Sequence, residues 1–129
     1  MNSTDLEVRV DCHLFGLADA EADESLPDAG RPSAWAGVGE SALVFESEED
    51  LVRARLRLEL WDGPAAIDGE QWPRTTTAAW TLPSGVLGVD ELTAGAVPEV
   101  FVVPPGEYAM RLGWHSEGAA LVQMWPTRR

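Results

Sequence analysis

Two histidines and a single cysteine are the side chains in this sequence that could act as a nucleophile, a general base or a soft metal ligand. His13 and His115 each lie on the polar face of a predicted strand, and neither has a second histidine or cysteine at metal-ligand spacing. Cys12 precedes His13, so within one strand their side chains point to opposite faces and cannot form a thiolate–imidazolium pair. The sequence also lacks a glycine-rich phosphate loop, a nucleophile elbow and an HExxH zinc motif. We therefore expect a protein that is not an enzyme and that carries no metal or other cofactor.

Acidic residues dominate the charge of the chain. The net charge is -13, from 22 acidic residues and nine basic residues, all of them arginine. Residues 1–50 hold 13 acids and two arginines, whereas residues 51–129 hold nine acids and seven arginines. A field of this sign repels nucleic acid and anionic membranes and attracts basic proteins. A basic protein partner is thus the expected ligand, and a merely solubilising acidic surface is the alternative.

Two acidic segments are the predicted contacts with such a partner: the loop at residues 18–34 and the short connection at residues 48–50. Asp19, Glu21 and Asp23 alternate as calcium ligands do, but the run has no glycine at its sixth position and no flanking helices, so we predict no metal site. The predicted partner-binding residues are Asp19, Glu21, Asp23, Glu24, Asp28, Glu48, Glu49 and Asp50.

Six tryptophans offer a second kind of site. Trp80 and Trp114 alternate with apolar core positions and are expected to be buried. Trp35, Trp61 and Trp72 lie at loop junctions, where exposed rings could form a platform for a sugar or a peptide. A small-ligand or carbohydrate-binding domain that uses these three residues is the alternative function. Anchoring of loops against the fold would explain the same placement without a ligand.

The elements that must position these side chains are β-strands. Residues 52–60 (V-R-A-R-L-R-L-E-L) alternate with period two, which puts the apolar side chains on one face and Arg53, Arg55 and Arg57 on the other. Residues 6–14 repeat the pattern, and we expect residues 42–47 to form a β-hairpin with the strand at 51–61. The arginine stripe is expected to pair with carboxylates on neighbouring strands; the candidates are Glu7, Asp11, Glu46 and Glu107.

Turn residues at short, regular spacing separate the predicted strands, and no convincing amphipathic helix is present. We predict an all-β fold: a single domain spanning residues 1–129, built as an antiparallel β-sandwich of about seven to eight strands with an acidic loop at 18–34. An open β-barrel is the alternative. The chain has no apolar run near the roughly 18 residues needed to cross a bilayer, no signal-peptide pattern and only one cysteine, which favours the cytoplasm.

Residues 101–108 (F-V-V-P-P-G-E-Y), followed by Trp114, form a strand–turn–strand segment. It resembles the segment near the end of the competence protein J family, small bacterial proteins that inhibit a DNA-entry nuclease. The order of elements is also similar: an N-terminal strand, an irregular stretch with a tryptophan, a strand ending at Phe45-Glu46, then a long strand. The resemblance implies an intracellular protein that binds a protein partner. The acidic N-terminal half would suit a nuclease with a basic groove, because carboxylates can occupy sites meant for phosphates.

Overall fold

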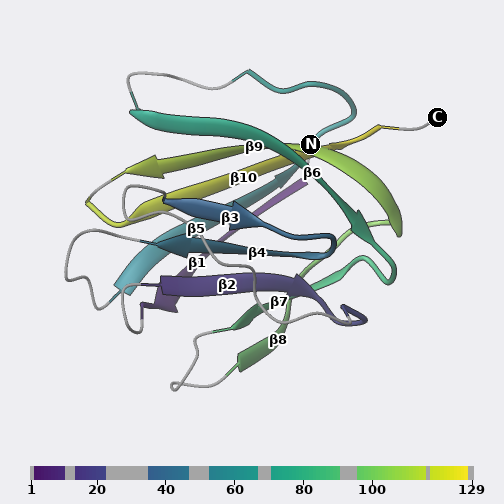
Figure 1. Cartoon of the computed structure of the whole chain (residues 1–129), viewed down its shortest axis with the longest axis horizontal. Helices are drawn as coiled ribbons and strands as arrows, with labels where there is room; N and C mark the ends of the chain where they lie inside the picture. The colour runs from purple at the N-terminus through teal and green to yellow at the C-terminus, as the bar shows by residue number, and fades with distance from the viewer. Residues whose placement is uncertain are drawn as a thin grey trace.

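The computed structural model describes residues 2–10, 14–22, 35–46, 53–66, 71–90, 96–115 and 117–127, which form a β-sandwich of ten strands (Figure 1). Sheet A has the order β1 (Asn2–Arg9), β5 (Arg53–Leu60), β10 (Ala119–Pro126), β9 (Gly106–His115) and β6 (Arg74–Leu82). Sheet B has the order β3 (Ala36–Val38), β4 (Ala42–Glu46), β2 (Leu14–Asp19), β7 (Val86–Asp90) and β8 (Ala96–Val102). The predicted all-β sandwich is confirmed, with more strands than expected. These ranges hold no helix long and apolar enough to span a membrane.

Strand β5 confirms the burial that the period-two alternation predicts. Ala54, Leu56 and Leu58 are buried on its inner face, as the alternation predicts. On one side β5 pairs antiparallel with β1, and on the other it pairs parallel with β10, with Ala120 opposite Leu56. Strand β10 lies between β5 and β9 and runs antiparallel to β9. Sheet A is therefore mixed, whereas every pair in sheet B is antiparallel.

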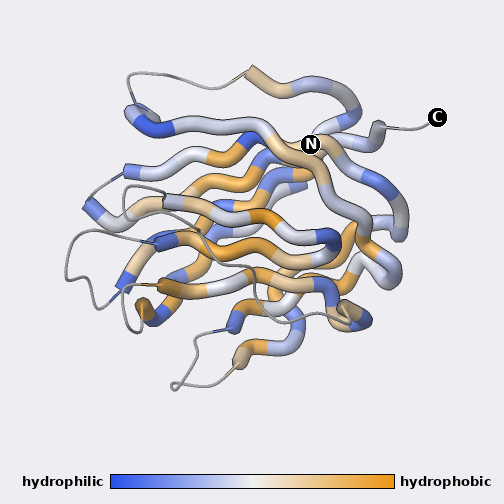
Figure 2. Tube along the Cα trace, viewed as in Figure 1, coloured by the Kyte–Doolittle hydropathy of each residue, from blue (hydrophilic) through white to orange (hydrophobic). Residues whose placement is uncertain are grey.

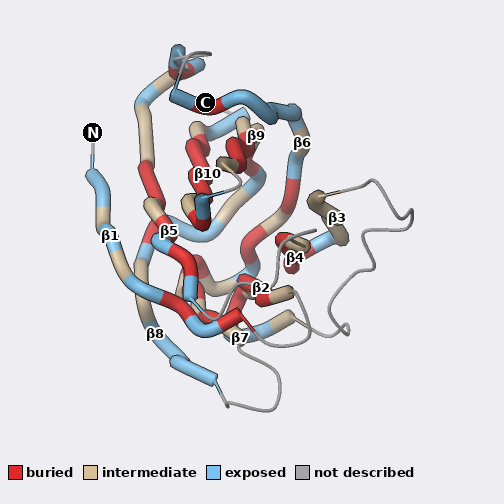
Figure 3. Tube along the Cα trace, turned by 90° about the vertical axis from the view of Figure 1, so that its left-hand side faces the viewer, coloured by how far each residue is buried: buried red, intermediate tan, exposed pale blue. Residues whose placement is uncertain are grey.

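The core lies between the two sheets. Apolar residues recur along the strands of both layers, and the buried positions gather on the faces that meet (Figures 2 and 3). The ring of Phe45 from β4 stacks on Phe15 from β2, with centroids 5.4 Å apart, and on Trp114 from β9 at 6.0 Å. Trp80 and Trp114 are both buried, as predicted. The contact between Phe45 and Trp114 thus joins the two sheets.

Two local expectations were wrong because each of them joined segments that lie in different sheets. The predicted hairpin of residues 42–47 with 51–61 does not form, since β4 pairs with β2 and β3 in sheet B while β5 lies in sheet A. The predicted strand at 6–14 is two strands: β1 ends at Arg9, and β2 begins at Leu14 in sheet B. The inward positions change from even in β1 to odd in β2, where Phe15, Leu17 and Asp19 are buried. Residues 11–13 lie outside the described ranges.

Candidate protein-binding groove

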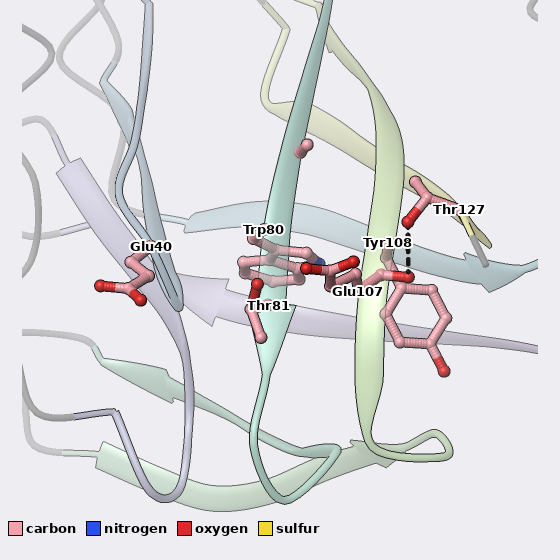
Figure 4. Close-up of a pocket in the computed structure, with 7 residues that line it drawn as sticks. Glu40, Trp80, Thr81, Glu107, Tyr108 and Thr127 are labelled. Atoms are coloured by element: carbon pink, nitrogen blue, oxygen red, sulfur yellow. Dashed lines mark hydrogen bonds between the residues drawn. The ribbon is translucent and has the colours of Figure 1, made fainter.

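A depression with two parts that share lining residues lies at the end of the sandwich where β5 and β10 end and β9 begins. One part, of about 340 Å³, is lined by Leu60, Trp61, Asp62, Pro104, Pro105, Gly106, Glu107, Tyr108 and Pro126. The adjoining part, of about 330 Å³, is lined by Glu40, Ala79, Trp80, Thr81, Glu107, Tyr108 and Thr127 (Figure 4). Glu107 and Tyr108 belong to both. We call the two parts together the acidic groove.

Three exposed carboxylates line the acidic groove. Glu40, Asp62 and Glu107 are exposed and line it, and none of the described residues that line it is basic. The three come from different elements: Glu40 from the connection between β3 and β4, Asp62 from the residues after β5, and Glu107 from the start of β9. A hydrogen bond of 2.8 Å from the amide of Thr81 to the Glu40 carbonyl joins the β3–β4 connection to sheet A. The fold thus gathers carboxylates that are far apart in sequence.

Tyr108 and the turn before it give the groove a fixed wall. The Tyr108 hydroxyl donates a hydrogen bond to the Pro104 carbonyl oxygen, which closes the turn through Pro105 and Gly106. Gly106 has a φ of 154°, a conformation that residues with a side chain rarely adopt. Burial raises the pKa of the Tyr108 phenol above its ordinary value of 10.0, so the hydroxyl stays a donor across the physiological range. The amide of Thr127 donates to the Glu107 carbonyl at 3.1 Å and holds the opposite rim.

Trp61, the other aromatic wall, is oriented by a buried carboxylate. Glu59 lies on the outer face of β5 and yet is only 7% exposed. It accepts hydrogen bonds from Arg57 Nε at 2.6 Å, Trp61 Nε1 at 2.8 Å and Gln123 Nε2 at 3.0 Å. Burial alone would raise the pKa of Glu59, but these bonds and the Arg57 charge outweigh it and lower that pKa. Arg57 also bonds Asp5 at 2.7 Å, so its charge is compensated on both sides.

The residues after β5 cover this outer face and so bury Glu59. Arg111 Nη1 donates to the Ala65 carbonyl at 2.6 Å, and Gln123 Nε2 to the Ala66 carbonyl at 3.2 Å. Trp72 is buried with its ring against Gly113, where a Cβ would lie 3.1 Å from the ring. Trp61 and Trp72 consequently line one cavity of about 230 Å³, together with Arg57, Glu59, Ala66, Gln71, Leu121 and Gln123.

Two of the three predicted loop tryptophans therefore come together, and the third does not. Trp35 stacks on Phe45 with centroids 6.1 Å apart and packs against the core, away from the Trp61–Trp72 cavity. The expectation that arginines of β5 pair with neighbouring carboxylates holds for Arg53, which bonds Glu7 at 3.4 Å. Glu46, another candidate, lies in sheet B.

Asp19 is a buried strand residue, whereas the sequence predicted that it lies in an acidic loop at residues 18–34. It is the last residue of β2 and 3% exposed. Its carboxylate accepts hydrogen bonds from the Gly85 amide at 2.8 Å, the Ser84 hydroxyl at 2.8 Å and the Glu21 amide at 2.8 Å. Asp19 thus closes the turn between β6 and β7 instead of facing solvent, whereas Glu21 is exposed. Six other predicted contacts lie outside the described residues: Asp23, Glu24, Asp28, Glu48, Glu49 and Asp50.

The histidines and the acids give no sign of a metal centre in the ranges that the structure describes, where no three His, Cys, Asp or Glu side chains gather. His115 Nδ1 accepts a hydrogen bond from the Glu117 amide at 3.1 Å, so it stabilises the hairpin between β9 and β10. Cys12 and His13 lie outside the described residues.

Two solved structures share this fold. ComJ from Bacillus subtilis, an inhibitor of the DNA-degrading activity of NucA, superposes with a TM-score of 0.73 over 98% of both chains, at 12% identity. The protein described as crocagin biosynthetic gene J superposes with a TM-score of 0.64 over 98% of this chain and 96% of its own, at 14% identity. The chain matches no protein-family model and none of the curated proteins with which it was compared. The resemblance to ComJ is therefore one of fold.

Proposed function

We propose that this chain, acting as a single domain over residues 1–129, binds a basic protein and inhibits it, with a bacterial nuclease as the first candidate. It would do so in the cytoplasm and without catalysing a reaction itself. The observation that carries the proposal is the acidic groove, which Glu40, Asp62 and Glu107 line and in which no described lining residue is basic. The shared fold with an inhibitor of a DNA-degrading activity supports the choice of a nuclease.

The physical argument is electrostatic. A nuclease binds a phosphate backbone and needs a positively charged surface for it, so a negatively charged surface of matching shape competes with DNA for the same place. Opposite charges also speed the encounter of the two proteins, and this gain falls as salt screens the charges.

The contact surface extends from the acidic groove to the acidic loop. The amide of Asp19 donates to the Ser41 carbonyl at 3.0 Å, so the chain leaves the sandwich after Ala20 beside Glu40. Exposed Glu21 follows at once. We keep Asp23, Glu24 and Asp28, and separately the segment Glu48, Glu49 and Asp50, as proposed contacts with the partner, and we assign Asp19 to the fold instead.

A pair of charge-matched variants tests the proposal. Each basic nuclease encoded in the source genome would be produced, and its cleavage of DNA measured with the wild-type protein and with each double variant. Glu40→Gln with Asp62→Asn removes two groove charges, and Glu99→Gln with Glu117→Gln removes two exposed charges elsewhere. We expect the groove variant to slow association roughly tenfold at low salt and the control variant to change it much less. Equal effects of the two variants, or no inhibited nuclease, would contradict the proposal.

The Trp61–Trp72 cavity favours a second candidate function, the binding of a small polar ligand such as a sugar. Arg57, Gln71 and Gln123 line it beside the two indole rings, a combination that suits a hydroxylated ligand. Tryptophan fluorescence would be followed across a panel of glycans. A saturable change that is lost in Trp72→Phe supports this function, and an unchanged spectrum with every glycan excludes it.

A further inference from the structure

We infer that the part of the acidic groove between Trp61 and Tyr108 receives one arginine side chain of the partner. The inference rests on the proposed function and deepens it, since it names the chemical group that the groove recognises. This part of the groove holds about 340 Å³ and combines two features: an apolar wall and the exposed carboxylate of Asp62.

The apolar wall suits the stem of a long side chain. Pro104, Pro105 and Pro126 supply rigid apolar surface, and the side chain of Trp61 lines the same part of the groove. An arginine buries its methylene groups on such surfaces while its charged end remains hydrated or paired. Prolines also lose little freedom when they are covered, which lowers the cost of the contact.

The charged end of the groove favours arginine over lysine. A guanidinium is planar, so it can stack on the Trp61 ring and present two parallel donors to a carboxylate, whereas an ammonium is a strongly hydrated point charge. Asp62 supplies an exposed carboxylate to this part of the groove, and none of the described residues that line it is basic. Arg57 lines the cavity on the other side of Trp61, where Asp5 and Glu59 pair with it, so it does not neutralise the groove.

Trp61 is held in place before the partner arrives. Its Nε1 donates to Glu59 Oε1 at 2.8 Å, and its amide donates to the Met124 carbonyl at 2.8 Å. Glu59 is fixed in turn by Arg57 and Gln123. Glu59 is thus a positioning residue: it does not line the groove, but it sets the orientation of the ring that the guanidinium would stack on. Because the ring is already ordered in the free protein, less side-chain conformational entropy is lost when the partner binds.

Peptide probes test the inference without the partner. The tripeptide acetyl-Gly-Arg-Gly-amide would be titrated into the full chain, along with its lysine and citrulline analogues, while the indole N–H resonances are followed by NMR. Citrulline has the shape of arginine without its charge. We expect the arginine peptide to shift the Trp61 resonance most, the lysine peptide to bind several-fold more weakly, and the citrulline peptide to leave it unmoved. Equal shifts with arginine and citrulline, or shifts confined to Trp72, would overturn the inference.

Three variants separate the parts of the argument. Asp62→Asn changes an exposed residue and should weaken arginine binding about tenfold, as expected for the loss of a charge-assisted contact. Glu59→Gln should move the Trp61 resonance in the free protein and weaken arginine binding while leaving the preference over citrulline. Glu99→Gln, on β8, serves as the control and should change neither. If Asp62→Asn binds the arginine peptide as tightly as the wild type, the assignment is wrong.

The two proposals fail in different ways. If the arginine peptide binds the groove but the wild-type protein inhibits no basic nuclease, the proposed function is wrong. The inference that the groove binds an arginine side chain then still holds. If a nuclease is inhibited but the arginine peptide does not bind, the inference is wrong and another feature of the acidic surface mediates inhibition.

Discussion

Asp19 Oδ2 accepts a hydrogen bond of 2.8 Å from the backbone amide of Gly85, 66 residues later in the chain. The bond ties the end of β2 to the turn where the chain passes from β6 in sheet A to β7 in sheet B. Gly85 has a φ of 75°, and a Cβ there would lie 1.9 Å from the Val103 carbonyl oxygen, so no other residue fits this corner. A buried carboxylate and a glycine together fix the crossing between the layers.

Replacing Asp19 with alanine should therefore destabilise the fold. The substitution leaves the Ser84 hydroxyl and the Glu21 and Gly85 amides without their acceptor, and each buried unsatisfied group costs about 1–3 kcal/mol. We expect a loss of roughly 3 kcal/mol in the free energy of unfolding, measured with urea. Glu21→Ala, two residues away and exposed, should stay within about 0.5 kcal/mol. Equal stabilities of the two variants would show that the Asp19 bonds contribute little.

Glu59 should make the stability of the protein depend on acid pH. Its pKa in the fold lies below the ordinary value of 4.5, so the folded state favours the charged form. The resulting stabilisation is complete above pH 4.5 and is lost as the pH falls through the lowered pKa. At neutral pH, Glu59→Gln should unfold at lower urea concentration than the wild type, and this difference should shrink on acidification below pH 4.5. A difference that stays constant with pH would contradict the lowered pKa.

Tyr108 should ionise above the ordinary tyrosine value. It is the single tyrosine of the chain, so absorbance at the phenolate band reports on it alone. Burial raises its pKa above 10.0, and the fold therefore favours the protonated phenol. The stabilisation is present below pH 10.0 and declines as the pH rises toward the raised pKa. The same titration in concentrated urea should return to about 10. A folded-state midpoint at or below that value would show that Tyr108 is hydrated.

Gly113 should be intolerant of a side chain because Trp72 lies on it. A Cβ at residue 113 would lie 3.1 Å from the Trp72 ring, so Gly113→Ala must push the ring outward. Overpacking of this kind costs about 1–3 kcal/mol, and we expect a matching loss in urea stability together with a change in tryptophan emission. Gly63 offers a control, since a Cβ there meets nothing within 4 Å. If Gly113→Ala and Gly63→Ala behave alike, Trp72 does not pack as described.

Local alternation explains how much of the fold was predictable. The period-two pattern gave β5 and its buried residues Leu56 and Leu58 because it depends only on neighbours in sequence. The same pattern does not show to which of the two sheets a strand belongs. Both β1 and β2 turn apolar side chains to one shared interior, so the alternation through residues 6–14 concealed the passage between layers.

The candidate site was less predictable because it depends on long-range contacts. Trp61 was recognisable at a loop junction, but its orientation as a groove wall follows from its hydrogen bond to the buried Glu59. Glu40 and Asp62 carried no local signal of a site, since each stands alone beside a turn. The dense acids at Asp19 and Glu21 drew attention instead, although the first of them is a structural residue.

The place of β10 in sheet A has a consequence for how the protein is made. This strand, at residues 119–126, lies between β5 and β9 and separates elements that are synthesised before it. During translation β1 and β5 can pair early, but they must wait beside an open sheet edge until β10 emerges and fills it. The nascent chain would then expose this strand edge while residues 61–118 are made. A chaperone that shields such an edge should raise the yield of folded protein.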